Sequence, residues 1–257
     1  MASSMGLSRA LCPHHSLCES AEVVDVVSCR LDVEAAEILD LRRLLDPEEL
    51  ARADRFHTGR LRDTFLIAHG RLRQLLGLVL GCQPSAVHLV VQPGGKPRLR
   101  LPAGDRLRFN LAHSAGMMVC AFALDHDVGI DVEHVRNERG WEDIALRFFA
   151  LPERHALSLL PPAARLSAFF AYWTCKEAVV KATGEGLARP LDSFVVSVTP
   201  DHPEILLCDK SLGPPENWRL AVVPVAAGYH AALAVRGAAA GASIRFWSWE
   251  QLASVAE

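Results

Sequence analysis

The sequence predicts an α+β fold, because strand-like and helix-like segments both occur in each half of the chain. Residues 58–80 and 163–183 have apolar side chains at the three-to-four-residue spacing of a long amphipathic helix. Shorter segments, such as the nearly all-apolar residues 117–124, have the composition of buried strands. Each half is therefore expected to combine strands with one long helix, although this periodicity does not establish a repeat between the halves.

The expected elements of the first half have recognisable starts. Residues 22–30 are Val-rich and predict a strand, after which Asp32 is suited to cap a helix. Asp46 precedes Pro47 and two glutamates, which is the pattern of a helix start with acidic residues at the positive end of the dipole. Strands are predicted after the long helix, at residues 87–91, 107–111 and 117–124.

The second half is expected to begin after a polar break at Asp125-His126-Asp127. Helical segments are predicted at residues 141–150, 152–160 and 163–183. Strands are predicted at residues 128–133, 194–198, 218–223, 230–235 and 243–247.

The composition indicates a compact protein of 257 residues. Half of the residues are hydrophobic, and the formal net charge of −3 argues against a general nucleic-acid-binding protein. No run approaches the roughly 20 apolar residues that span a bilayer, and a signal peptide is not expected. An odd number of scattered cysteines, seven, suits free thiols in a reducing cytoplasm, so we expect a cytoplasmic protein without membrane or nucleic-acid partners.

Residues 1–21 are expected to form a loose tail. The stretch from Cys12 to Cys18 contains the residue types that bind zinc. Because no second Cys/His pair stands at zinc-finger spacing, the tail remains the preferred interpretation.

Three carboxylates and a lysine are the first candidates for chemistry. Asp131 and Glu133 are two residues apart in a predicted strand, so both side chains point to the same face. Glu177 and Lys181 are four residues apart in a helix whose other side chains are largely apolar. Solvated acids on the strand and a surface ion pair on the helix remain open alternatives. Together, however, the four groups have the chemistry that a divalent metal and a phosphate-bearing substrate require.

Weaker candidates surround them. His113 and Ser114 follow a predicted strand and could donate hydrogen bonds to phosphate oxygens, although a histidine at a strand end is more often structural. Lys96 lies in a glycine- and proline-rich turn, residues 93–97, which could bind an anion but is not a Walker loop. Several arginines, among them Arg52 and Arg55, crowd the region before and within the first long helix. Most fit a solvated helix face, and one or two could reach a phosphate.

Four motifs occur in an order that identifies a family. They are Gly95-Lys96-Pro97, Phe109-Asn110-Leu111-Ala112-His113-Ser114, Gly129-Ile130-Asp131-Val132-Glu133, and the run from Trp173 through Lys176-Glu177 and Lys181 to Gly184-x-Gly186-Leu187. Together they resemble the 4′-phosphopantetheinyl transferases of the Sfp type, enzymes that modify carrier proteins of peptide, polyketide and fatty-acid synthases. The resemblance covers about residues 46–197. Ala112 stands where this family usually has serine.

The resemblance implies two similar α+β halves related by a pseudo-twofold axis, here residues 22–124 and 127–257, with coenzyme A in the cleft between them. It also implies that one chain builds the cleft, so a monomer is expected. The expected reaction transfers 4′-phosphopantetheine from coenzyme A to a serine of an acyl or peptidyl carrier protein and releases adenosine 3′,5′-bisphosphate.

The resemblance further implies the roles of individual residues. Mg²⁺ would be held against the pyrophosphate by Asp131, Glu133 and Glu177. Glu177 would also act as the base for the serine hydroxyl, and Lys181 would neutralise phosphate charge. Contacts to the rest of coenzyme A are implied for His113, Ser114, Lys96, Pro97, Arg52 and Arg55.

Two other functions are considered. A metal-dependent nucleotide or coenzyme A hydrolase could use the same carboxylates without a carrier protein. A non-catalytic module that binds carrier proteins would be expected to lack metal ligands, but Asp131, Glu133, Glu177 and Lys181 are all present. The sequence does not indicate which carrier is modified or whether acylated coenzyme A is accepted.

Overall fold

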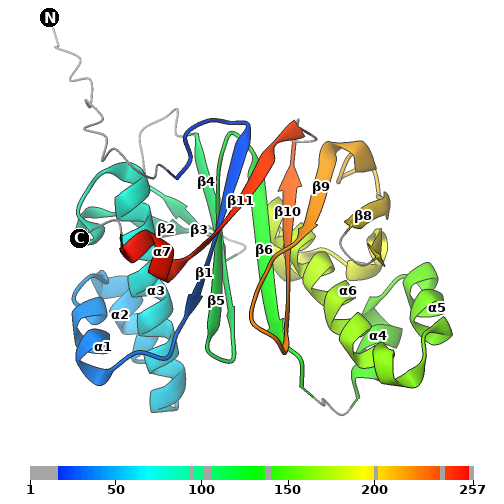
Figure 1. Cartoon of the computed structure of the whole chain (residues 1–257), viewed down its shortest axis with the longest axis horizontal. Helices are drawn as coiled ribbons and strands as arrows, with labels where there is room; N and C mark the ends of the chain where they lie inside the picture. Colours follow the sequence, from blue (N-terminus) through cyan, green and yellow to red (C-terminus); the bar gives the residue numbers. More distant parts are fainter. Residues whose placement is uncertain are drawn as a thin grey trace, which may run out of the picture.

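The computed structural model describes residues 17–92, 95–100, 106–136, 140–199, 202–237 and 241–254. The chain folds into layers, with a long helix on each outer side and two β-sheets between the helices (Figure 1). Most of the expected tail, including Cys12, and Gly94 of the predicted turn lie outside the described residues. Within those ranges, no helix has both the length and the apolar character needed to cross a membrane.

The first half begins with the predicted strand β1 (Val23–Arg30), and the long helix α3 (Gly59–Leu80) packs on its sheet. Helix α3 starts where the Thr58 hydroxyl accepts a hydrogen bond from the Leu61 N–H, and it ends at Gly81 in the left-handed conformation. The other elements are α1 (Ala35–Arg42), α2 (Pro47–Ala53), β2 (Leu89–Val91), β3 (Pro97–Leu99), β4 (Leu107–Ser114) and β5 (Met117–Leu124).

Helix α2 confirms the start predicted at Asp46. The Asp46 carboxylate accepts a hydrogen bond from Glu49 N–H at 2.9 Å, and the Glu49 carboxylate accepts one from Asp46 N–H at 3.1 Å. The buried guanidinium of Arg73 on α3 pairs with both acids, at 2.7 Å and 2.6 Å. This arginine, which lies within the first long helix, therefore joins α2 to α3.

The second half repeats this plan. It begins with β6 (Asp127–His134), and its long helix α6 (Pro162–Thr183) packs on its sheet. The other elements are α4 (Trp141–Phe148), α5 (Leu151–Leu159), β7 (Val195–Thr199), β8 (His202–Leu207), β9 (Trp218–Val222) and β10 (Tyr229–Arg236). Strand β8, which the sequence did not predict, forms a hairpin with β7.

The order of the strands shows that the two halves share one topology. The first sheet has the order β11-β1-β5-β4, and the second has the order β6-β10-β9. In the first sheet β1 lies beside β5, which lies beside β4, and in the second sheet β6 lies beside β10, which lies beside β9. Both sheets carry a helix of 22 residues and are accompanied by a two-stranded hairpin. The expected pair of similar α+β halves is therefore confirmed.

The C-terminal strand β11 (Ser243–Ser248) does not join the sheet of the half in which it was placed. It pairs in parallel with β1 of the first half, with Val23 opposite Ser243. The fully buried carboxylate of Asp25 fixes this pairing, because it accepts hydrogen bonds from the side chains of Arg245 and Trp247 at 2.8–2.9 Å. Helix α7 (Trp249–Ala253) follows. The boundary of the halves remains a prediction, but residues 243–248 belong to the first sheet.

Besides the apolar cores between each long helix and its sheet, another apolar core lies between the two sheets. Its members from the first sheet are Val24, Val26, Ala112, Met117, Val119, Ala121 and Ala123, and those from the second half include Val128, Ile130, Val132, Leu233 and Val235. Strand β5 is buried from Met117 to Ala123, as its apolar sequence predicted. At the junction, the buried amide of Asn110 on β4 accepts a hydrogen bond from Ile130 N–H on β6 at 2.8 Å. The end of β4 is thereby fixed beside β6.

Candidate active site

Asp131 lies at the centre of the candidate site, where β6 faces helix α6. Its carboxylate is buried, and Oδ1 accepts a hydrogen bond from Lys181 Nζ at 2.6 Å. Oδ2 is buried too but has no hydrogen-bond partner among the described residues. An unpaired oxygen on a buried carboxylate is costly unless a cation or another donor satisfies it. The structure therefore brings two predicted residues together and leaves one acceptor for a ligand.

Gly129 allows helix α6 to approach Asp131 this closely. A Cβ atom at Gly129 would lie 2.0 Å from the carbonyl oxygen of Ala178 and 2.3 Å from the nitrogen of Ala182. Any other residue would push α6 away from β6 and carry Lys181 with it. The glycine at the start of the Gly-Ile-Asp-Val-Glu motif thus has a packing role.

The three predicted carboxylates influence one another. Burial raises the pKa of Asp131 to about 6; Lys181 opposes this rise, whereas the charges of Glu133 and Glu177 add to it. Burial also raises the pKa of Glu177, which Lys181 lowers and Glu133 raises. Carboxylates that repel one another in this way are stabilised by a shared cation.

The donor set and the unpaired oxygen of Asp131 fit a hard divalent cation that binds oxygen. In the described part of the chain, however, no three Asp, Glu, His or Cys side chains converge closely enough to enclose a metal. The pairing between Asp131 and Lys181 occupies one of the carboxylate oxygens that such an ion would use. The metal assignment therefore stays a prediction.

Ser114 contacts Glu133. Its hydroxyl donates a hydrogen bond to Glu133 Oε2 at 2.7 Å and accepts one from His134 N–H at 3.3 Å. The turn that follows Ser114 includes Ala115, with φ of 44°, and its carbonyl oxygen accepts a hydrogen bond from the Tyr229 hydroxyl at 2.6 Å. Ser114 therefore joins the end of β4 to Glu133, a role that its motif did not predict; contact with a phosphate is not tested.

His113 points into a hollow beside Lys181. Its side chain is open to solvent, yet the surrounding protein lowers its pKa, and the positive charges of His69, Lys181 and Arg52 lower it further. A neutral imidazole carries one N–H donor and one acceptor. His113 is therefore suited to donate a hydrogen bond to an anion in this hollow.

Lys96 is engaged by backbone carbonyls. Its Nζ donates hydrogen bonds to the carbonyl oxygens of Val128 and Lys181, both at 2.8 Å. Burial lowers the pKa of Lys96 to about 8, although the charge of Asp127 raises it. The ammonium thus joins the β2–β3 hairpin of the first half to β6 and α6 of the second half. Its neighbour Pro97 lines the cavities described next.

Two cavities meet at Lys181. The first, of about 490 Å³, is lined by Glu177 and by the apolar side chains of Phe148, Trp173 and Leu191. The second, of about 710 Å³, is lined by His113, His69 and two arginines. Four residues line both cavities: Gly95, Pro97, Leu111 and Lys181. The first cavity is therefore mainly apolar, whereas the second carries charges of both signs, since Asp46, Glu48 and Glu49 line it as well. Lys181, which pairs with Asp131, lies at their junction.

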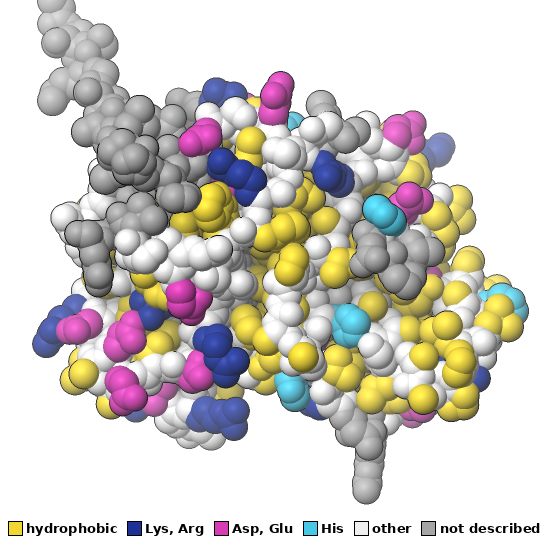
Figure 2. Space-filling model, in the orientation of Figure 1, with side chains coloured by type: hydrophobic (Ala, Val, Ile, Leu, Met, Phe, Trp, Pro, Cys, Tyr) yellow, Lys and Arg dark blue, Asp and Glu magenta, His cyan; other side chains and the backbone are white. Residues whose placement is uncertain are grey.

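The two arginines in the second cavity are Arg52 and Arg55. Both are exposed, and the guanidinium of Arg52 lies over the ring of Phe65 at 5.3 Å. Another arginine of this group fits the solvated alternative, since Arg62 pairs with Asp63 on the surface of α3. Figure 2 shows basic and acidic side chains intermingled over the helices of the first half. The structure thus separates two arginines that reach the cavity from those on a solvated face.

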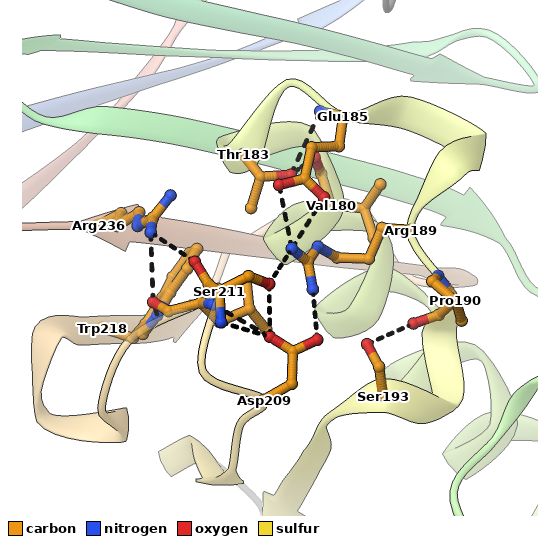
Figure 3. Close-up of polar contacts among 11 residues, drawn as sticks. Val180, Thr183, Glu185, Arg189, Pro190, Ser193, Asp209, Ser211, Trp218 and Arg236 are labelled. Carbon is orange, nitrogen blue, oxygen red and sulfur yellow. Dashed lines mark hydrogen bonds and ion pairs between the residues drawn. The ribbon is translucent and has the colours of Figure 1, made fainter.

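Sequence reasoning missed part of this site. Phe148 and Arg189 line the first cavity, but neither lies in a motif that predicts it. Arg189 is buried and forms ion pairs with Glu185 and Asp209 (Figure 3). Lys176, in the signature motif beside Glu177, is fully buried against Glu153 rather than in a cavity. Its place in the motif reflects packing.

Comparison with known proteins identifies related enzymes. Residues 127–234 match the model of the 4′-phosphopantetheinyl transferase superfamily. The chain is 40% identical over 178 residues to the 4′-phosphopantetheinyl transferase HetI of Nostoc sp.. The aligned residues make up 67% of this chain and 73% of HetI. It is 29% identical over 157 residues to the transferase Sfp of Bacillus subtilis, and the aligned residues make up 61% of this chain and 68% of Sfp.

Among solved structures, the holo-[acyl-carrier-protein] synthase of Thermotoga maritima is similar at 22% identity, covering 43% of this chain and 62% of that one, with a TM-score of 0.36. That likeness is too low to support an argument. The relatives named above are transferases, and none supports the alternative of a hydrolase. By its similarity to HetI, the chain belongs to the 4′-phosphopantetheinyl transferase superfamily and is an enzyme of that class.

Proposed function

We propose that this enzyme transfers 4′-phosphopantetheine from coenzyme A to a serine hydroxyl of an acyl or peptidyl carrier protein. Family membership supports the transfer itself. The observation that carries the proposal for this chain is the junction of the two cavities, where Lys181 pairs with Asp131 and Glu177 lines the wall. A molecule with a charged end and an uncharged arm would lie across this junction with its pyrophosphate beside Lys181.

We assign the charged end of coenzyme A to the second cavity. Arg52 and Arg55 offer planar guanidinium groups, which bind phosphate in a bidentate manner. His113, which lines this cavity, would donate one hydrogen bond to a phosphate oxygen. Ser114 and Lys96 would support this site indirectly, since their polar atoms already contact Glu133 and backbone carbonyls. The pantetheine arm would then enter the apolar first cavity.

We propose that Asp131, Glu133 and Glu177 hold Mg²⁺. When bound there, the ion would neutralise pyrophosphate charge, which is the main contribution of metals to phosphoryl transfer. The support is the oxygen donor set, the unpaired Oδ2 of Asp131 and the mutual repulsion of the carboxylates. Lys181 would add a second positive charge on the same side of the substrate.

Glu177 is the proposed general base. A serine hydroxyl is a weak nucleophile near neutral pH, and a positioned base accelerates its attack by roughly 10²–10⁴-fold. The Glu177 carboxylate would take the hydroxyl proton as the serine oxygen forms a bond to the phosphorus next to pantetheine. The bond from that phosphorus to the bridging oxygen breaks, and adenosine 3′,5′-bisphosphate leaves with both electrons of the bond.

The deciding experiment measures the intact mass of apo carrier proteins after incubation with this enzyme, coenzyme A and Mg²⁺. The expected result is the addition of one phosphopantetheine group at the carrier serine, lost with EDTA and with Glu177→Gln. Consumption of coenzyme A without modification of any of several acyl and peptidyl carriers would instead support the hydrolase. Modification that persists in EDTA would contradict the metal assignment.

We also propose that the enzyme acts as a monomer. Both cavities are lined by residues of the first half, Pro97 and Leu111, and of the second half, Lys181, so the two halves of one chain meet there. Light scattering at the concentration of the activity assay tests this proposal, and an active dimer with an inactive monomer would contradict it.

A further inference from the structure

One wall of the first cavity is built by a segment that has little regular structure. Gly184, Gly186, Arg189, Pro190 and Leu191 line the cavity directly after helix α6 ends. Their backbone forms only two short 3₁₀ turns, and both glycines have a positive φ, 74° and 59°. These residues, all within the described part of the chain, pair with neither sheet. Such a segment needs contacts from elsewhere to hold one shape.

Arg189 supplies those contacts. Its side chain is 4% exposed, and its guanidinium donates from Nη1 to Asp209 Oδ2 at 3.0 Å and from Nη2 to Ser211 Oγ at 2.8 Å. Nη2 also pairs with Glu185, four residues earlier, at 2.8 Å. Figure 3 shows the guanidinium between the turn that carries Glu185 and the loop that carries Asp209 and Ser211. A single side chain therefore ties the cavity wall to a loop beyond β8.

That loop is itself fixed. Asp209 Oδ1 accepts hydrogen bonds from the N–H groups of Ser211 and Leu212, at 2.9 Å and 3.1 Å. The Leu212 carbonyl accepts a hydrogen bond from the Trp218 indole on β9 at 3.1 Å. Arg236 on β10 donates to the carbonyl of Ser211 at 3.1 Å (Figure 3). The position of the cavity wall is thus set, through Arg189, by the second sheet.

Stability alone does not explain this arrangement. The two acids that pair with Arg189 are about 40% exposed, Glu185 at 43% and Asp209 at 39%, and ion pairs with such exposed partners contribute little to folding. The guanidinium, by contrast, is withdrawn from solvent into the wall of a cavity that also contains Glu177 and Lys181. Asp209 and Ser211 do not line that cavity. The network therefore acts on the cavity through Arg189.

We infer that Arg189 is a positioning residue for the pantetheine arm of coenzyme A, and that it has no part in recognising the nucleotide. This inference rests on the proposed function, which places the arm in the first cavity and the nucleotide in the second. Arg189 lines only the first cavity. Loss of its contacts would let the wall move and would weaken binding of the arm, while Arg52, Arg55 and His113 remain unchanged.

The test compares two ligands that differ in the arm. Coenzyme A has both parts, whereas adenosine 3′,5′-bisphosphate lacks the arm together with the phosphate that carries it. Arg189→Lys keeps the positive charge but loses the planar guanidinium, whose two terminal nitrogens donate to Asp209 and Ser211. Asp209→Asn keeps an oxygen for the Ser211 and Leu212 N–H groups but removes the ion pair, and it changes no cavity-lining residue. Arg165→Lys is the matched control, because Arg165 joins α6 to the carbonyls of Leu160 and Ser158 and lines neither cavity.

Isothermal titration calorimetry should show that both Arg189→Lys and Asp209→Asn weaken coenzyme A binding by about tenfold. Affinity for adenosine 3′,5′-bisphosphate should stay within about twofold of wild type, and the Arg165→Lys control should change neither affinity. An equal loss for both ligands, or an unchanged affinity for coenzyme A, would overturn the inference. If the wild-type protein bound no coenzyme A, the proposed function itself would fail, so the two failures are distinguishable.

Discussion

Lys176 lies beside the proposed base in the signature motif, yet we predict that it governs stability. The side chains of Lys176 and Glu153 are both fully buried, and Lys176 Nζ donates to Glu153 Oε1 at 2.5 Å and to the Phe194 carbonyl at 2.8 Å. Glu153 also accepts hydrogen bonds from the N–H groups of Ala150 and Val196, both at 2.8 Å. The pair therefore joins α5, α6 and the start of β7.

The Lys176→Met substitution leaves the Glu153 carboxylate in the core without its counter-charge. Removal of one partner of a buried ion pair costs about 3–5 kcal/mol. Because whole domains are stable by only about 5–15 kcal/mol, such a loss takes a large share of the free energy of unfolding. Lys176→Met combined with Glu153→Gln should recover part of it, since no charge is then buried, while the single Gln oxygen can accept a hydrogen bond from only one of the two N–H groups.

Urea unfolding followed by tryptophan fluorescence, with linear extrapolation, measures these differences. Arg165→Met is the matched control on the same helix. Arg165 donates to the backbone carbonyls of Leu160 and Ser158, so its loss leaves no buried carboxylate without a counter-charge and should cost less stability. If Lys176→Met unfolded within about 1 kcal/mol of wild type, the reasoning from burial would be refuted.

Three further predictions concern the junction of the halves. Ser114→Ala should raise the Mg²⁺ concentration needed for activity by about 10–100-fold and should weaken Mn²⁺ binding measured by electron paramagnetic resonance, because Glu133 loses its hydrogen bond. Ser114→Thr, which keeps the hydroxyl, should restore both. Unchanged Mn²⁺ binding in Ser114→Ala would mean that Ser114 does not position Glu133. Gly129→Ala should lower the melting temperature sharply because its Cβ meets the backbone of α6, whereas Gly59→Ala, which meets nothing within 4 Å, should not. Burial lowers the pKa of Lys96 to about 8, so between about pH 8 and 10.5 the unfolded chain binds more protons than the folded chain. The free energy of unfolding should therefore rise with pH in this range. Urea titrations should show that this rise is missing in Lys96→Met.

The sequence predicted those features that depend on neighbours along the chain. The helix start at Asp46 follows from local capping chemistry, and the shared orientation of Asp131 and Glu133 follows from the two-residue period of a strand. Helix α6 was predicted from the spacing of its apolar residues. Its four-residue separation places Glu177 and Lys181 on the same helix face, and both line the first cavity.

Features that join distant residues were not predictable in this way. The partners Lys176 and Glu153 are 23 residues apart, and Arg189 and Asp209 are 20 apart, so no local period connects them. Strand β8 was missed because Pro203 interrupts a short segment that otherwise has strand-like residues. The role of Ser114 was missed because its motif names the residue but does not say that Glu133 lies within hydrogen-bonding distance.

The pairing of β11 with β1 has a consequence for synthesis of the protein. Strand β1 is made early, but the strand that covers its outer edge is made about 220 residues later, as the partners Val23 and Ser243 show. At typical rates of about 5–20 residues per second, that edge waits on the order of ten seconds or longer on the ribosome. An uncovered strand edge is a template for pairing with another chain. The nascent chain therefore leaves this edge of β1 open to pairing with other chains until β11 has been made.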